Sequence, residues 1–145
     1  GGEKCQQAQF AVLDLHSVES LGTFDGILCS SVLEYLAEPE EFVEACARCL
    51  RPGGALVISV PNRKSLLRRM LRHVHRSLRG LCGVEWPAYL RFSKNEYSGD
   101  EFSAVLHQHG FTVDARTVFG ASLPGIPADW QCGGALYLFT ATRRA

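Results

Sequence analysis

The fold is decided by one stretch of the sequence, FDGILCSSVLEYLAEPEEFVEACARCLRPGGALVISVPN, which runs from Phe24 to Asn62. Its two apolar runs, 26–29 and 55–60, have the length and continuity of parallel strands that are covered on both faces. Between them, a segment that begins at Pro39 with acidic residues repeats its apolar positions at helical spacing. The sequence Pro52-Gly53-Gly54 predicts the end of this helix. The stretch therefore predicts a strand, a helix and a second strand.

Segments on either side of this stretch extend the pattern. Residues 10–15 form another apolar run typical of a buried strand, and 112–119 and 135–142 predict two terminal strands paired as an antiparallel hairpin. Ser98 and Glu101 have the spacing of a capping box, which predicts the start of a further helix. Alternating strands and helices indicate an α/β fold, with right-handed crossovers that place the helices on the faces of the sheet.

Composition limits the class of protein. The chain has 145 residues, 46% of them hydrophobic, and a formal net charge of +0, as expected for one globular domain with a core. It contains no apolar run of about 18 residues and no signal-peptide pattern, which favours a cytoplasmic protein. The irregular spacing of the cysteines predicts free thiols rather than a disulfide framework. The six cysteines are Cys5, Cys29, Cys46, Cys49, Cys82 and Cys132.

A basic block follows Asn62. Residues 62–84 contain no acidic residue, and their apolar positions recur at helical spacing, which predicts a basic amphipathic helix. The apolar face of this helix either covers an active site or, in the alternative interpretation, lies on an anionic membrane surface through 63–79. Nucleic acid is excluded as a partner, because the block lacks aromatic residues for base stacking and the whole chain is neutral.

The carboxyl ends of the predicted parallel strands should meet along one rim. Ligands of open α/β sheets bind outside these ends. Three groups of residues end the predicted strands: Asp14-Leu15, Cys29-Ser30-Ser31 and Pro61-Asn62. Small polar residues at these positions leave room for a ligand and can form hydrogen bonds with it.

In their order and spacing, these segments resemble the Rossmann-like (class I) S-adenosylmethionine-dependent methyltransferases, especially the small-molecule branch that includes ubiquinone-biosynthesis O-methyltransferases. The hallmark is LRPGGALVISVPN. The third strand of that family is similar to AQFAVLDLHSVESLGTFD, and its last helix with the sixth strand is similar to YSGDEFSAVLHQHGFTVDARTVFG. Its final strand is similar to GALYLFTATRR. The resemblance covers nearly all of the chain. It implies S-adenosylmethionine as cofactor and a mostly parallel sheet, truncated at the N-terminus and closed by the antiparallel hairpin.

The resemblance also implies roles for single residues. Asp14 would accept a hydrogen bond from the adenine amino group, and Leu15 would pack near the ring. Cys29 and Ser30 would lie beside the methionine moiety. Two alternatives remain: Asp14 as a strand-end acid that caps its loop, and Cys29 as a small buried apolar residue.

For the acceptor, the resemblance implies in-line displacement of the sulfonium methyl group by a small molecule that the protein aligns. Glu34, Tyr35, Asn62 and Tyr97 are the predicted substrate residues. Related quinone methyltransferases carry a histidine after the acid. Here Tyr35 follows Glu34, so we expect no metal.

The catalytic residue stays unassigned. If the acceptor is a hydroxyl group, the candidates for the base are Tyr35, His73, His75 and Tyr97, because proton removal requires a group within hydrogen-bond reach. For His73 and His75, a place on a solvated basic face is the favoured interpretation.

The chain departs from the family in one respect. The first strand with its glycine-rich loop, and the second strand, have no counterpart in it. We therefore expect 1–145 to form a single partial methyltransferase domain of a longer protein, in which 62–97 is a substrate-cover insertion that carries the basic helix. The alternative is a non-catalytic interaction module that pairs with a partner chain or a membrane through its sheet edge or its basic helix.

Overall fold

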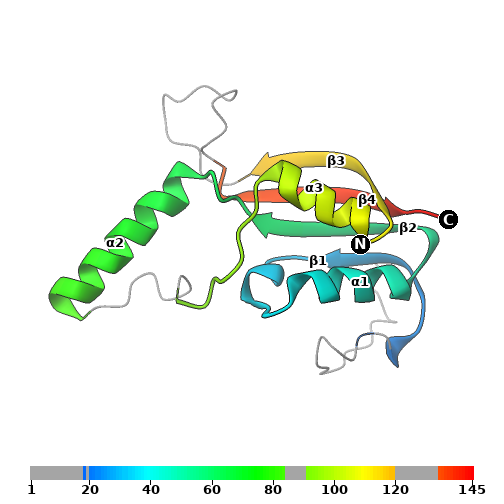
Figure 1. Cartoon of the computed structure of the whole chain (residues 1–145), viewed down its shortest axis with the longest axis horizontal. Coiled ribbons are helices and arrows are strands. Elements are labelled where there is room, and N and C mark those ends of the chain that lie inside the picture. Colours follow the sequence, from blue (N-terminus) through cyan, green and yellow to red (C-terminus); the bar gives the residue numbers. More distant parts are fainter. Residues whose placement is uncertain (1–17, 19, 84–90, 120–133) are drawn as a thin grey trace, which may run out of the picture.

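Four strands form one sheet in the computed structural model, which describes residue 18 and residues 20–83, 91–119 and 134–145 (Figure 1). The strands are β1 (Phe24–Cys29), β2 (Leu50–Pro61), β3 (Phe111–Phe119) and β4 (Leu136–Arg143). Their order in the sheet is β1-β2-β4-β3. The strand predicted at 10–15 lies outside the described residues.

The sheet is mixed. β1 pairs with β2 in parallel, whereas β4 pairs antiparallel with both β2 and β3. The parallel pair needs a crossover, and α1 (Pro39–Cys49) supplies it. The predicted α/β class and the antiparallel hairpin of the last two strands are thereby confirmed.

Side chains cap the two helices that follow β2. A short 3-10 helix, η2 (Leu33–Tyr35), follows β1, and α2 (Leu66–Cys82) begins at Ser65, whose side chain accepts a hydrogen bond from the backbone of Arg68. α3 (Gly99–Gln108) has the predicted capping box. In it, the Ser98 hydroxyl accepts from the Glu101 amide and the Glu101 carboxylate accepts from the Ser98 amide.

The end of α1 differs from the prediction. The helix ends at Cys49, three residues before Pro52, because Leu50 is already extended and pairs with Phe24 of β1. The Pro52-Gly53-Gly54 sequence forms an irregularity within β2 instead, since the register with β1 shifts between Leu50 and Ala55. Gly53 has a φ of 79°, a conformation that favours glycine.

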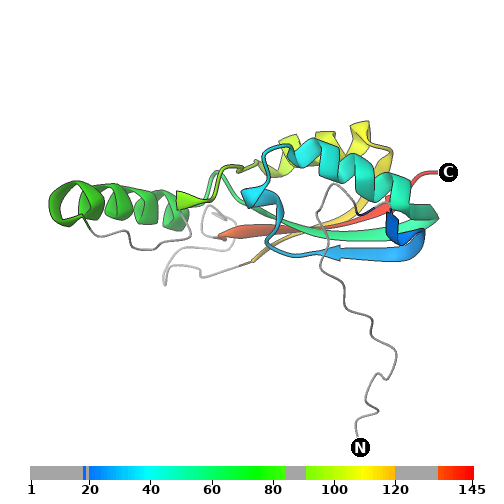
Figure 2. The ribbon, with the colours of Figure 1, turned by 90° about the horizontal axis from the view of Figure 1, so that it is seen from below.

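Helices α1 and α3 lie on the same face of the sheet (Figure 2), and the core is packed between them and the strands. The prediction that both faces are covered is wrong for the described part of the chain, because Leu28 in β1 is 75% exposed on the other face. α2 extends away from the sheet (Figures 1 and 2). The continuous apolar run of β1 resembled a doubly covered strand, but no described helix packs on its second face.

The capping box of α3 makes the stability of the domain depend on pH. Hydrogen bonds from Ser98 and Arg63 lower the pKa of Glu101 to about 2. Because this pKa lies below that of an unfolded glutamate, the stabilisation is complete above about pH 4.5 and is lost as the pH falls toward about 2. We expect Glu101→Gln to lower the free energy of unfolding at pH 7 and to flatten its fall in acid, measured by urea denaturation from pH 7 to 2.

Glu41→Gln is the control, since it removes a carboxylate outside the capping box. It should keep the pH dependence of the parent chain. Equal pH dependence in the parent chain and in Glu101→Gln would contradict the assignment.

Candidate functional site

The carboxyl ends of β1 and β2 form a rim at one edge of the sheet, as their parallel pairing requires (Figure 1). Buried Cys29 ends β1 and exposed Ser30 follows it. Ser31 has a φ of 56°, which is uncommon for a residue other than glycine, and its amide donates to the Ser59 hydroxyl of β2 at 2.8 Å. A constrained turn after a strand is a frequent feature of ligand sites.

Cys29 lies beneath this rim, where its side chain is part of the hydrophobic core. Burial raises the pKa of its thiol to about 11, so the thiol is protonated at neutral pH and is a poor nucleophile. Ser30, in contrast, is exposed on the rim and can form a hydrogen bond with a ligand. Asp14 and Leu15, the other two predicted cofactor residues, lie outside the described part of the chain.

Glu34 follows the rim in η2 and belongs to a buried ion-pair network. Its carboxylate accepts hydrogen bonds from Arg68 Nη2 and from Ser93 Oγ, both at 3.0 Å. Arg68 also donates through Nε to Glu96 at 3.3 Å, and Arg72 forms an ion pair with the same carboxylate. The network is Glu34, Arg68, Arg72, Ser93 and Glu96, and it joins η2, α2 and the segment before α3.

Arg68 is the buried residue of α2, with 5% of its side chain exposed. The amphipathic pattern of this helix puts Arg68 opposite the apolar residues, but it did not predict that Arg68 is buried. Its partners Glu34 and Glu96 are distant in the sequence, so no local pattern reveals the contact. The carboxylate of Glu34 is thus already bound to Arg68 and Ser93, and the predicted contact of Glu34 with substrate stays a prediction.

Asn62 and Tyr97 lie together beyond the end of β2, where they form an isolated bridge. Asn62 is fully buried, and both polar atoms of its side chain are satisfied. Its Nδ2 donates to the Gly134 carbonyl at 2.9 Å, and its Oδ1 accepts from the Lys64 amide at 2.8 Å. These bonds fix the turn that leads into α2. The structure therefore gives Asn62 a clear supporting position, and its contact with substrate stays a prediction.

The two tyrosines differ in exposure. Tyr97 packs its ring against Phe102, with 5.1 Å between the ring centroids. Burial raises the pKa of Tyr97, and the nearby Glu40 carboxylate raises it further. A tyrosine with a raised pKa is a hydrogen-bond donor at neutral pH and a poor base. Tyr35 is 41% exposed beside the rim. His73 and His75 lie on α2, away from the end of β1.

Within the described ranges, no three His, Cys, Asp or Glu side chains are grouped so that they could hold a metal ion. None of the four cysteines that the structure describes is in a disulfide, in agreement with the predicted thiols.

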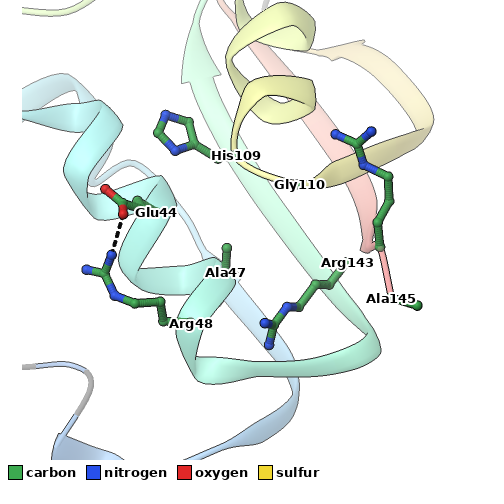
Figure 3. A pocket seen from close by; sticks show the side chains of 8 residues that line it. Glu44, Ala47, Arg48, His109, Gly110, Arg143 and Ala145 are labelled. Carbon is green, nitrogen blue, oxygen red and sulfur yellow. Dashed lines mark ion pairs between the residues drawn. The ribbon is translucent and has the colours of Figure 1, made fainter.

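A cavity of about 460 Å³ lies at the opposite end of the sheet, between α1 and the C-terminus (Figure 3). Arg143 donates to the Leu50 carbonyl and Arg144 to the His107 carbonyl, so both arginines satisfy backbone groups at the ends of α1 and α3. Arg48 pairs with Glu44 at 2.6 Å. These cations support the helix ends, and the cavity lies away from the rim.

The chain can now be compared with known proteins. Residues 3–116 match the family model described as a methyltransferase domain. The chain belongs to this methyltransferase family. The order of the segments that the structure describes is as the sequence resemblance implied.

Similar curated proteins are ubiquinone biosynthesis O-methyltransferases. That of Xanthomonas oryzae pv. oryzae is 37% identical over 65 residues, which are 43% of this chain and 27% of the relative. That of Caulobacter sp. strain K31 is 42% identical over 45 residues, 31% of this chain and 18% of the relative. The matched part thus spans 27% or less of these two relatives.

Solved structures share the fold. A SAM-dependent methyltransferase from Archaeoglobus fulgidus has a TM-score of 0.65 at 15% identity, over 92% of this chain and 66% of that one. The magnesium protoporphyrin IX methyltransferase from Synechocystis PCC 6803, with bound SAH, has a TM-score of 0.62 at 14% identity, over 90% of this chain and 49% of that one. Both confirm the Rossmann-like methyltransferase fold.

The buried ion-pair network predicts a difference between neighbouring arginines of α2. Arg68→Met leaves the Glu34 carboxylate buried without its cation, which should lower the free energy of unfolding by about 3–5 kcal/mol. Arg69→Met, the matched change at an exposed position, should change it by less than about 0.5 kcal/mol. Urea denaturation measures both.

A second variant tests the pair itself. Glu34→Gln removes the stranded charge, so the double variant Glu34→Gln/Arg68→Met should lose less than the sum of the two single variants. Additive losses, or equal losses at Arg68 and Arg69, would show that the pair does not join η2 to α2.

Proposed function

We propose that the rim at the carboxyl ends of β1 and β2 forms one side of a methyltransferase active site. The enzyme would transfer a methyl group from S-adenosylmethionine to a small-molecule acceptor. The observation that supports this most is the rim itself, where Ser30 and the constrained Ser31 follow the parallel strand β1 within a methyltransferase domain. The bound SAH of the Synechocystis structure supports the choice of cofactor. The name of the curated relatives favours a hydroxyl oxygen as the acceptor atom.

In the proposed reaction, S-adenosylmethionine supplies a methyl group activated by the sulfonium. Cys29 gives the methionine moiety an apolar wall, and the Ser30 hydroxyl forms a hydrogen bond with its polar end. Tyr97 and Tyr35 would orient the acceptor for in-line attack, in which the new bond from the acceptor oxygen to carbon forms as the carbon–sulfur bond breaks. The electron pair of the broken bond stays on sulfur, and the hydroxyl proton leaves to water. Tyr97 acts as a donor because its raised pKa keeps its proton.

The cofactor proposal predicts a specific effect at Asp14. In the protein at its natural length, Asp14→Asn should weaken the binding of S-adenosylhomocysteine about tenfold or more. The reason is that a hydrogen bond to a charged group contributes roughly 1.5–3 kcal/mol. Asp25→Asn is the control, since Asp25 is exposed and pairs with Arg51 at 2.6 Å. Isothermal titration calorimetry measures both affinities.

Two outcomes count against the proposal. Unchanged affinity in Asp14→Asn would favour the loop-capping role of that acid, and no binding by the natural-length protein would overturn the cofactor. The 145-residue chain alone should bind weakly or not at all, since the glycine-rich loop has no counterpart in it. Micromolar binding by this chain would contradict that expectation.

We further propose that the apolar face of α2 contacts an anionic membrane surface. Leu66, Met70, Val74 and Leu81 on this face are exposed, Met70 by 56% and Leu81 by 84%. The opposite side of the helix is fixed to the domain by Arg68, so the apolar face points outward rather than over the rim. This favours the membrane over the lid interpretation. No described helix is both long and apolar enough to cross a bilayer.

The membrane proposal predicts that added charge on the apolar face weakens vesicle binding. Met70→Glu/Val74→Glu should abolish co-sedimentation with anionic vesicles at low salt, because two carboxylates would have to enter the interface. Thr112→Glu/Thr117→Glu is the control, since it adds the same charge at exposed positions of β3. Unchanged co-sedimentation of the α2 variant, or no co-sedimentation of the parent chain, would contradict the membrane proposal and favour the lid interpretation. Arg68 and Arg72 are left intact because they hold the helix in place.

A further inference from the structure

A serine interrupts the apolar run of β2. Ser59 stands between Ile58 and Val60, which are fully buried, and is itself only 1% exposed. A buried polar side chain needs a hydrogen-bond partner, because the loss of its contact with water is otherwise uncompensated. Side chains alternate along a strand, so Ser59 points to the face of the sheet opposite α1 and α3 (Figure 2). The proposed reaction gives this serine no role.

The partner of Ser59 is the turn that follows β1. The last paired residues of β1 and β2 are Cys29 and Ile58, so Ser59 is one position past the end of β1. There the Ser31 amide donates a hydrogen bond to the Ser59 hydroxyl at 2.8 Å, across 28 positions of sequence. This bond joins the rim turn, Ser30-Ser31, to the neighbouring strand.

The rim turn needs such a contact because its backbone conformation is uncommon. Ser31 has a φ of 56°, in the left-handed region, and every other described residue with a positive φ is a glycine. A residue with a side chain stays in this region only where its surroundings favour it. Ser31 is exposed, so burial of its side chain does not supply that support. The hydroxyl of Ser59 is the contact that does.

The 3-10 helix η2 after the rim turn has a support of its own. Asn95 Nδ2 donates to the carbonyls of Leu33 and Leu36, at 2.9 and 2.7 Å. These bonds hold η2 from the segment before α3 and do not involve β2. Loss of the Ser59 hydroxyl should therefore release the rim turn while η2 stays in place. The effect on the site is local.

We propose that Ser59 is a positioning residue for the cofactor. Its hydroxyl holds Ser31 in the left-handed conformation, and that conformation aims the Ser30 side chain at the polar end of the methionine moiety. A side chain that is ordered before binding costs less conformational entropy when the ligand arrives. Ser59 acts through the rim turn and does not touch the cofactor. This role rests on the proposed function, in which Ser30 forms that hydrogen bond.

The test is the affinity of the natural-length protein for S-adenosylhomocysteine, measured by isothermal titration calorimetry. Ser59→Ala should weaken binding roughly threefold to tenfold, the range that one lost hydrogen bond gives. Ser59→Thr keeps the hydroxyl group and should bind more tightly than Ser59→Ala. The matched control is Ser103→Ala, which removes a 2.8 Å hydrogen bond to the Gly99 carbonyl in α3 and should leave the affinity unchanged.

Two further measurements separate positioning from a purely structural role. In urea denaturation, Ser59→Ala and Ser103→Ala should lose similar free energies of unfolding, since each loses one hydrogen bond, but only Ser59→Ala should lose affinity. In a double-mutant cycle, Ser30→Ala/Ser59→Ala should bind about as weakly as the weaker single variant, because both changes remove the same contact with the ligand.

Each other result counts against the proposal. Unchanged affinity in Ser59→Ala, or equal weakening in Ser103→Ala, would overturn it. Additive losses in the cycle would also overturn it, because Ser59 would then act without Ser30. In these cases the parent protein still binds the ligand, so the proposed function stands. No binding by the parent protein would instead reject the proposed function, and the role of Ser59 with it.

Discussion

The ion pair between Arg68 and Glu34 joins η2, which follows β1, to α2 across 34 residues of sequence. Both side chains are almost completely buried, so the pair is stabilising only because Ser93 and Glu96 satisfy the remaining hydrogen bonds. The backbone strengthens the same joint, since the Lys94 amide donates to the Glu34 carbonyl at 2.7 Å. Buried charge, and not apolar burial, therefore sets how α2 leaves the domain.

This constraint gives the two sides of α2 different uses. The basic side, through Arg72, Arg76 and Arg79, lines a cavity of about 280 Å³ together with Arg91. The apolar side is left exposed at Met70 and Leu81. The exposed apolar side is the surface on which the proposed membrane contact rests.

Local patterns predicted most of the fold. The capping box at Ser98, the helix from Pro39 and the terminal hairpin depend on residues close in the sequence, and the structure confirms them. Long-range contacts were not predictable in this way. The rule that an amphipathic helix turns its apolar face inward failed for α2, because Arg68 finds carboxylates that only the tertiary fold brings near. The exposure of Leu28 likewise depends on which elements cover the sheet.

The most direct test of the central claim is a crystal structure of the natural-length protein with S-adenosylhomocysteine. The account predicts that the homocysteine moiety lies against Cys29 and Ser30 at the carboxyl end of β1, while Arg68 still pairs with Glu34. A ligand bound at the other end of the sheet, in the cavity beside Arg143, would contradict it. So would a structure in which the rim is filled by another part of the protein and no cofactor binds there.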